Sequence, residues 1–188
     1  EGNIQTETIS ATVSDEMRTD AVVAVIIAAI CMLIYIWIRF KNLAFGASSV
    51  LALIHDVIVV LMVYALLRNW VSVGNTFIAC MLTIVGYSIN NTIVVFDRIR
   101  ENAQLKPGKA NLASVVDLSV NQTISRSVNT TITTFLMVIM LVIFGVDAVR
   151  QFAIPLVAGI VCGCYSSICI AGALYYLFVA RTGKKEKK

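Results

Sequence analysis

Five long apolar segments limit the possible folds of this chain more than any other feature. They cover residues 21–38, 43–67, 77–96, 124–144 and 152–179. Each is close to the ~20 residues that a helix needs to cross a hydrocarbon core. In lipid, only a helix or a closed barrel satisfies its own backbone, and barrel strands would be shorter and alternate in polarity. We therefore predict an all-α polytopic membrane protein with five transmembrane helices.

The composition supports this class and excludes others. Of the 188 residues, 59% are hydrophobic and 14% are charged, whereas a soluble domain has about 25% charged residues. The five cysteines all lie in apolar segments, where we expect small helix residues and no metal site, disulfide or cofactor. The sequence contains no nucleophile–base arrangement and no phosphate-binding loop, so we expect no enzymatic activity.

The basic residues predict the orientation. Of the fifteen Lys and Arg residues, only Arg18, Arg68 and Arg150 fall on one predicted side of the membrane. The positive-inside rule places the other side in the cytoplasm. Residues 1–19 are then an extracytoplasmic tail, residues 20–180 the membrane domain, and residues 181–188 a cytoplasmic basic tail. The connection before residue 124 contains either a short helix lying on the membrane face or a plain loop.

Asp56 lies near the middle of the second segment, with His55 beside it. An ionised carboxylate at that depth is costly, which favours a role as an ion or proton relay. The alternative is a neutral Asp that hydrogen-bonds a neighbouring helix. His55 lies about 100° further round the helix, so we expect it on a different face, in a structural role.

A second polar site is predicted between the third and fourth segments. Asn90 and Asn91 lie at a depth similar to that of Arg126 on an antiparallel helix. Arg126, Asn129 and Thr133 follow a helical period, which indicates a polar face directed into the bundle or a wet cavity. We expect Arg126 within hydrogen-bonding reach of Asn90 or Asn91. The alternative for the Asn and Thr residues is simple helix–helix hydrogen bonding.

Two further patterns have less specific meanings. A charge cluster at the end of the third segment is either a solvated, charge-paired helix end or a docking site for a partner. Small residues at intervals of four in the last segment indicate close helix packing. The cluster comprises Asp97, Arg98, Arg100 and Glu101, and the packing positions are Gly86, Gly159, Gly163 and Ser167.

The chain resembles the SecF family of bacterial protein-translocation proteins. The resemblance covers most of the chain, and its specific parts are residues 35–40, His55-Asp56, residues 86–102, residues 121–126 and residues 165–167. It implies the fold of the resistance-nodulation-division superfamily. A SecF half has six membrane helices with an outer domain between the first two, so this chain resembles the last five.

The resemblance also implies a function. The family helps to move unfolded secretory polypeptides through the SecY channel, using the proton or sodium gradient, together with a separate or fused SecD. It implies a multi-pass protein of the bacterial cytoplasmic membrane, in contact with lipid and not with nucleic acid. The alternatives are an uncoupled scaffold for SecD and a small-molecule or lipid exporter.

One position departs from the family motif, which has an acid where this chain has Asn91. That acid is a proposed proton carrier close to the residue that matches Arg126. Asn cannot titrate in this pH range. Coupling then uses another acid, such as Asp56 or one in SecD, or sodium, or it is lost at this position.

Overall fold

The computed structural model describes residues 19–20, 23–24, 26–28, 30–31, 34–36, 38–39, 43–68, 70–71, 75–105 and 111–185. All regular structure in these ranges is helical. After the first helical residues, the elements are α2 (Leu43–Leu66), α3 (Asn75–Leu105), α4 (Leu112–Phe144), α5 (Asp147–Tyr165), the π-helical η1 (Ser166–Ala171) and α6 (Gly172–Lys185).

Four helical stretches in the described part are long and apolar enough to cross a membrane. They are Leu43–Leu66, Thr76–Leu105, Leu112–Phe144 and Asp147–Arg181, which match the second to fifth predicted segments. The prediction of an all-helical membrane protein is confirmed. The first predicted segment lies partly outside the described residues, as does most of the predicted outer tail, so the count of five stays a prediction.

Helix α4 begins earlier than the hydropathy pattern indicates. It is one helix of 33 residues, so the prediction of a separate short helix or a loop before residue 124 is wrong. Asn111 caps its start, because its side chain accepts a 3.2 Å hydrogen bond from the backbone N–H of Ala113. The first turns of α4 also bury Val115 and Val116. This cap and this burial favour a continuous helix.

The last segment is one continuous helical rod, made of α5, η1 and α6 and covering residues 147–185, with a π-helical stretch inside it. Helix α5 passes into η1, which is six residues of π-helix, and then into α6. Pro155 is the ninth residue of α5 and therefore lies inside the helix, beyond its first turn. Helix α6 continues to Lys185 and therefore enters the segment predicted as a basic tail.

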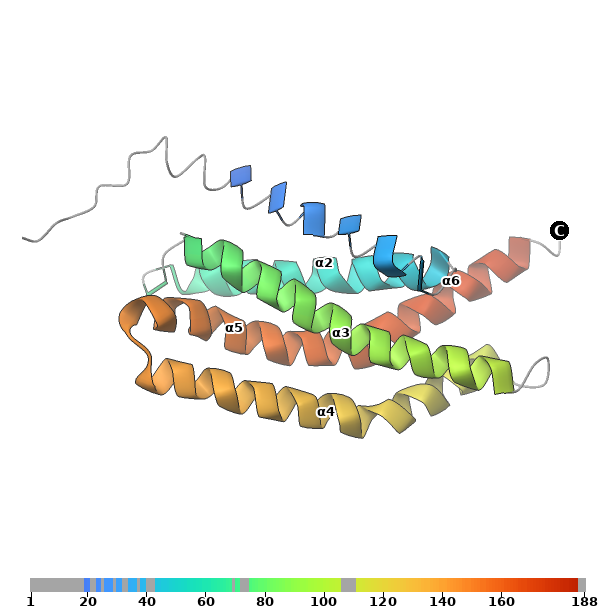
Figure 1. Ribbon diagram of the computed structural model, residues 1–188. Helices are drawn as coiled ribbons and strands as arrows, with labels where there is room; N and C mark the ends of the chain where they lie inside the picture. The colour runs from blue at the N-terminus through green and yellow to red at the C-terminus, as the bar shows by residue number, and fades with distance from the viewer. Residues whose placement is uncertain are drawn as a thin grey trace, which may run out of the picture.

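Two apolar clusters form the core. One surrounds Phe45 and Phe96, and the stacked rings of Phe45 and Tyr175 have centroids 4.1 Å apart. The other surrounds Val60 and Ile84. Figure 1 shows α3 running obliquely across the bundle, where it packs against α2, α4 and α5. A layer of buried polar residues lies between the two clusters along α2 and α3, and it contains the candidate site.

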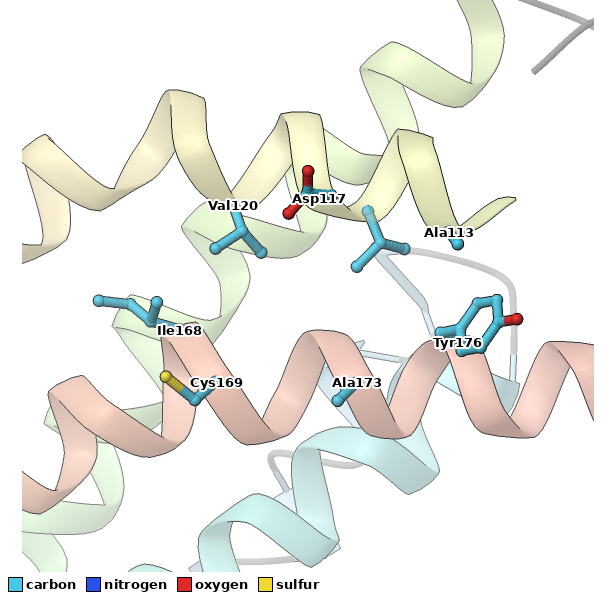
Figure 2. Close-up of a pocket in the computed structure, with 8 residues that line it drawn as sticks. Ala113, Asp117, Val120, Ile168, Cys169, Ala173 and Tyr176 are labelled. Carbon is cyan, nitrogen blue, oxygen red and sulfur yellow. The ribbon is translucent and has the colours of Figure 1, made fainter. Parts of the chain in front are cut away.

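A groove opens between the first turns of α4 and the η1–α6 part of the last rod. It has a volume of about 350 Å³. Figure 2 shows Asp117 and Val120 on one wall, with Ile168, Cys169 and Tyr176 on the other. The walls are mostly apolar, and the Asp117 side chain is an exposed acid in the lining.

Candidate functional site

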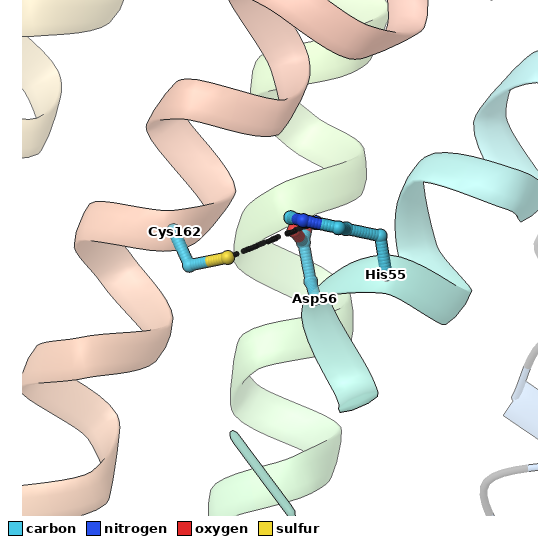
Figure 3. Close-up of side chains that lie close together, drawn as sticks. All are labelled: His55, Asp56 and Cys162. Carbon is cyan, nitrogen blue, oxygen red and sulfur yellow. Dashed lines mark hydrogen bonds and ion pairs between the residues drawn. The ribbon is translucent and has the colours of Figure 1, made fainter. Parts of the chain in front are cut away.

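The carboxylate of Asp56 is the centre of the buried polar layer. Asp56 is fully buried, with an exposed fraction of 0%. Atom Oδ2 accepts hydrogen bonds from the hydroxyls of Ser88 on α3 and Ser166 on η1, the latter at 2.6 Å. Atom Oδ1 faces His55 and Cys162 (Figure 3). One carboxylate thus joins three helices. Its role as an ion or proton relay, and the alternative of a neutral Asp that hydrogen-bonds a neighbouring helix, both stay predictions.

His55 and Cys162 complete this site and were not predicted to belong to it. His55 Nδ1 lies 3.1 Å from Asp56 Oδ1, and the Cys162 thiol donates a hydrogen bond to the same oxygen at 3.4 Å. The expectation that His55 faces away is wrong, because its long side chain reaches back round the helix. The expectation that the cysteines are only small helix residues does not account for Cys162.

Ser166 reaches Asp56 from a π-helical segment. The wider turn of η1 begins at Ser166, and such π turns occur often at functional sites. The next residue, Ser167, is also buried and donates a 3.4 Å hydrogen bond to the Ser88 carbonyl, which links η1 to α3. Hydroxyls are common in membrane helices, so Ser88 and Ser166 gave no sequence signal by themselves.

Asn91 lies inside the bundle, whereas Asn90 is exposed. Atom Nδ2 of Asn91 has no hydrogen-bond partner among the described residues, and the same holds for the buried hydroxyl of Ser127 on α4. Two interhelical pairs, Tyr87–Thr131 and Arg98–Gln122, set the antiparallel register of α3 and α4. Counting from these pairs places Asn91 level with Ser127. Unpaired buried donors at one level are the usual setting for an internal water.

Arg126 is exposed on α4. The same register places it level with the residues just after Asn91, so the predicted similarity in depth holds. Within the described ranges, however, no hydrogen bond joins Arg126 to Asn90 or Asn91. The predicted polar face points outward, because Asn129 and Thr133 are also exposed. Thr133 donates a 2.9 Å hydrogen bond to a carbonyl of its own helix.

The charge cluster at the end of α3 makes tertiary contacts. Asp97 pairs at 2.9 Å with Arg39, which follows the first predicted span. Arg98 pairs with Glu101 at 2.6 Å and donates a 2.7 Å hydrogen bond to Gln122 on α4. The cluster therefore links the end of the first predicted span, α3 and α4 at one end of the bundle.

Arg100 belongs to this cluster through a weaker contact, a 3.4 Å hydrogen bond to the Arg39 carbonyl. Nearby, the amide of Asn102 donates hydrogen bonds of 2.8 Å to Ser119 and 2.9 Å to Gln122. The paired helix end predicted from the sequence thus also fastens α3 to α4.

The packing glycines differ from one another. A Cβ at Gly159 would overlap the Ile84 side chain, with Cγ1 only 2.6 Å away, so this glycine lets α5 approach α3 closely. At Gly163 the nearest atom, Ser88 Cβ, is 3.4 Å away, which is ordinary close packing. A Cβ at Gly86 would meet nothing within 4 Å. The assignment of Gly86 to close helix packing is therefore wrong.

Comparison with known proteins identifies the family. Residues 2–181 match the family described as "Protein export membrane protein SecD/SecF, C-terminal". The chain belongs to this SecD/SecF family. A protein translocase subunit SecF of Alicyclobacillus acidocaldarius is 43% identical over 185 residues, which are 97% of this chain and 59% of the relative. A SecF of Sebaldella termitidis is 45% identical, covering 98% of this chain and 58% of the relative.

Solved structures show the same bundle. The crystal structure of SecDF from Thermus thermophilus superposes with a TM-score of 0.82 at 41% identity, covering 93% of this chain and 23% of that one. A SecDF structure in the super-membrane-facing form also gives a TM-score of 0.82. The chain spans about three fifths of the length of its SecF relatives. The SecF-type architecture predicted from the sequence is thus confirmed.

Proposed function

We propose that this chain is the membrane part of a SecF-type subunit that helps to move secreted polypeptides across the bacterial cytoplasmic membrane. The observation that carries the proposal is the match of the bundle to SecDF, with a TM-score of 0.82 over 95% of the chain. The partners are SecD, the SecY channel and the unfolded secretory polypeptide, within a lipid environment. The role is mechanical and not enzymatic.

We propose further that a proton or sodium gradient acts on the bundle through Asp56. Its carboxylate is fully buried and bonded to side chains of α2, α3 and the α5–η1 rod. A change in the charge of a buried group is costly unless its partners rearrange. Because these partners belong to different helices, such a change would move the helices relative to one another.

The outward polar face supports a SecD partner. Arg126, Asn90 and Asn129 are exposed on α3 and α4, and the register places Asn90 level with Asn129. An arginine that faces lipid at this depth is unfavourable by about 2.5–3.5 kcal/mol on insertion scales. A second membrane half that covers this face and provides an acid for Arg126 removes that cost. We therefore assign this face to SecD.

The orientation is part of the proposal. The basic residues gathered at the Asp97 end and in the C-terminal segment put that end in the cytoplasm, and the opposite end outside. The charge cluster of α3 then lies on the cytoplasmic side.

An uncoupled scaffold for SecD is the second candidate, and Asn91 favours it. This buried amide stands where the family motif has an acid, and an amide carries no proton. The scaffold would retain the SecD contact and lose the response to the gradient.

The test uses the full-length protein that carries this segment, expressed in bacteria depleted of their own SecF. We expect it to co-purify with SecD and to restore secretion of a reporter preprotein. Arg126→Gln should weaken SecD co-purification, and the exposed Ser125→Ala serves as the matched control on the same helix. Co-purification without restored secretion would favour the scaffold. A failure of both would contradict the SecF-type role.

A further inference from the structure

Three side chains of different chemistry converge beside the buried carboxylate. His55 Nδ1 lies 3.1 Å from Asp56 Oδ1, and Cys162 Sγ lies 3.4 Å from that oxygen and 3.8 Å from Nδ1. Figure 3 shows the imidazole, the carboxylate and the thiol pointing toward one another from α2 and α5. A nitrogen, an oxygen and a sulfur therefore form a small triangle inside the bundle.

The edges of this triangle match those of a zinc coordination sphere. Zinc binds nitrogen and oxygen at about 2.0–2.1 Å and sulfur at about 2.3 Å in tetrahedral sites. One face of such a tetrahedron has edges of about 3.4 Å for N–O and about 3.5–3.6 Å for both O–S and N–S. The observed 3.1, 3.4 and 3.8 Å differ from these by a few tenths of an ångström. The three ligand atoms therefore lie close to the separations that a shared ion requires.

We propose that His55, Asp56 and Cys162 form a binding site for a divalent transition-metal ion of the zinc class. Magnesium and calcium prefer all-oxygen sites, whereas this mixed N, O and S set suits zinc, and cobalt or cadmium in its place. The thiol proton leaves to solvent as the metal–sulfur bond forms, and no electron is transferred. The thiolate and the carboxylate together balance the two charges of the ion, so the site is neutral inside an apolar bundle.

The surroundings of Asp56 orient it for this role. The hydroxyls of Ser88 and Ser166 both occupy Oδ2, which leaves Oδ1 directed at His55 and Cys162. Hydrogen bonds of this kind fix ligand orientation in metal sites and raise affinity. Three protein ligands leave a fourth position for a water molecule or another ligand. The His55 side chain is 39% exposed and Asp56 is fully buried, so the imidazole lies closer to the bundle surface than the carboxylate.

A bound ion would tie α2 to α5 and hold Asp56 in one charge state. The site does not depend on the proposed translocation role, because its ligands all belong to this chain. Its occupancy can therefore be measured on the purified protein, without any export assay.

The experiment uses full-length protein in detergent, titrated with Co²⁺ as an optical probe. A thiolate ligand produces a sulfur-to-cobalt charge-transfer band. We expect this band at one ion per chain, its loss when Zn²⁺ is added, and its absence in Cys162→Ala. The matched control is Cys164→Ala, which removes a neighbouring thiol of the same helix and should keep the band. His55→Gln should weaken Co²⁺ binding by about tenfold or more.

A second measurement guards against variants that fail to fold. In the parent protein, Zn²⁺ should slow alkylation of Cys162 and leave the rate at Cys164 unchanged, as followed by mass spectrometry of the labelled peptides. The absence of a charge-transfer band in the parent would overturn the proposal. So would a band that persists in Cys162→Ala, or equal protection of both thiols.

Discussion

The hydroxyl of Ser166 donates a 2.6 Å hydrogen bond to the carboxylate of Asp56, although 110 residues separate them in the chain. Ser166 is the first residue of the π-helical segment η1. The wide turn thus places a donor from the last rod against an acid of α2. Since Ser88 of α3 binds the same oxygen, the three helices meet at one atom.

Removing the Ser166 hydroxyl should destabilise the bundle. In Ser166→Ala, Asp56 Oδ2 loses one of its two donors, and hydrogen bonds between membrane helices contribute about 0.6–1.7 kcal/mol. We expect a loss of this size in the free energy of unfolding of the full-length protein in detergent. The exposed Ser125→Ala should change it little. Equal effects of the two variants would contradict the inferred role of Ser166.

Gly159 and Gly86 should respond differently to the same substitution. Gly159→Ala introduces a Cβ that overlaps Ile84, and overpacking of this kind costs about 1–3 kcal/mol. Gly86→Ala introduces a Cβ into open space and gains helix propensity. Thermal unfolding of both variants is the measurement. If Gly86→Ala lowers the stability as much as Gly159→Ala does, the inferred close packing of α5 on α3 at Gly159 is contradicted.

The basic residues predict the orientation of the helices, which single-cysteine labelling can measure. In a background without the native cysteines, Val146→Cys should react with a membrane-impermeant reagent added outside intact cells. Gln104→Cys should react only after the membrane is opened. Both positions are exposed at opposite ends of the bundle. The reverse labelling pattern would invert the proposed topology.

The family acid can be restored at Asn91. Asn91→Asp adds an ionisable group at a buried position, level with the part of α4 that carries Arg126. We expect the gradient to stimulate export more strongly in the full-length variant, together with SecD, than in the parent protein. If Asn91→Asp changes nothing, this position does not limit coupling.

The sequence predicted those features of the fold that depend only on the residues of a single helix. A membrane helix must satisfy its own backbone, so hydropathy locates the spans. Hydropathy could not locate the start of α4, because that start depends on the Asn111 cap and on the tertiary burial of Val115. The π turn at Ser166 has no signature in hydropathy either, because the residues there are as apolar on average as those of a regular helix.

The candidate site was predicted in part for similar reasons. Asp56 stood out because a buried acid is costly. Ser88 and Ser166 did not, because a hydroxyl can bond a carbonyl of its own helix at little cost. Periodicity showed that Arg126 and Asn129 share a face, but it contains no information on whether that face points toward Asn91 or away from this chain.

Export of a preprotein from vesicles measures whether the proton or sodium gradient acts through Asp56. The vesicles contain the SecY channel, SecD and the full-length protein, and export of a preprotein is compared with and without a proton or sodium gradient. Asp117→Asn, at an exposed acid, is the matched control, and SecD co-purification reports assembly. We predict that the gradient stimulates the parent and the control, whereas Asp56→Asn assembles with SecD and shows no stimulation. Full stimulation of the Asp56→Asn protein would show that the gradient does not act through Asp56.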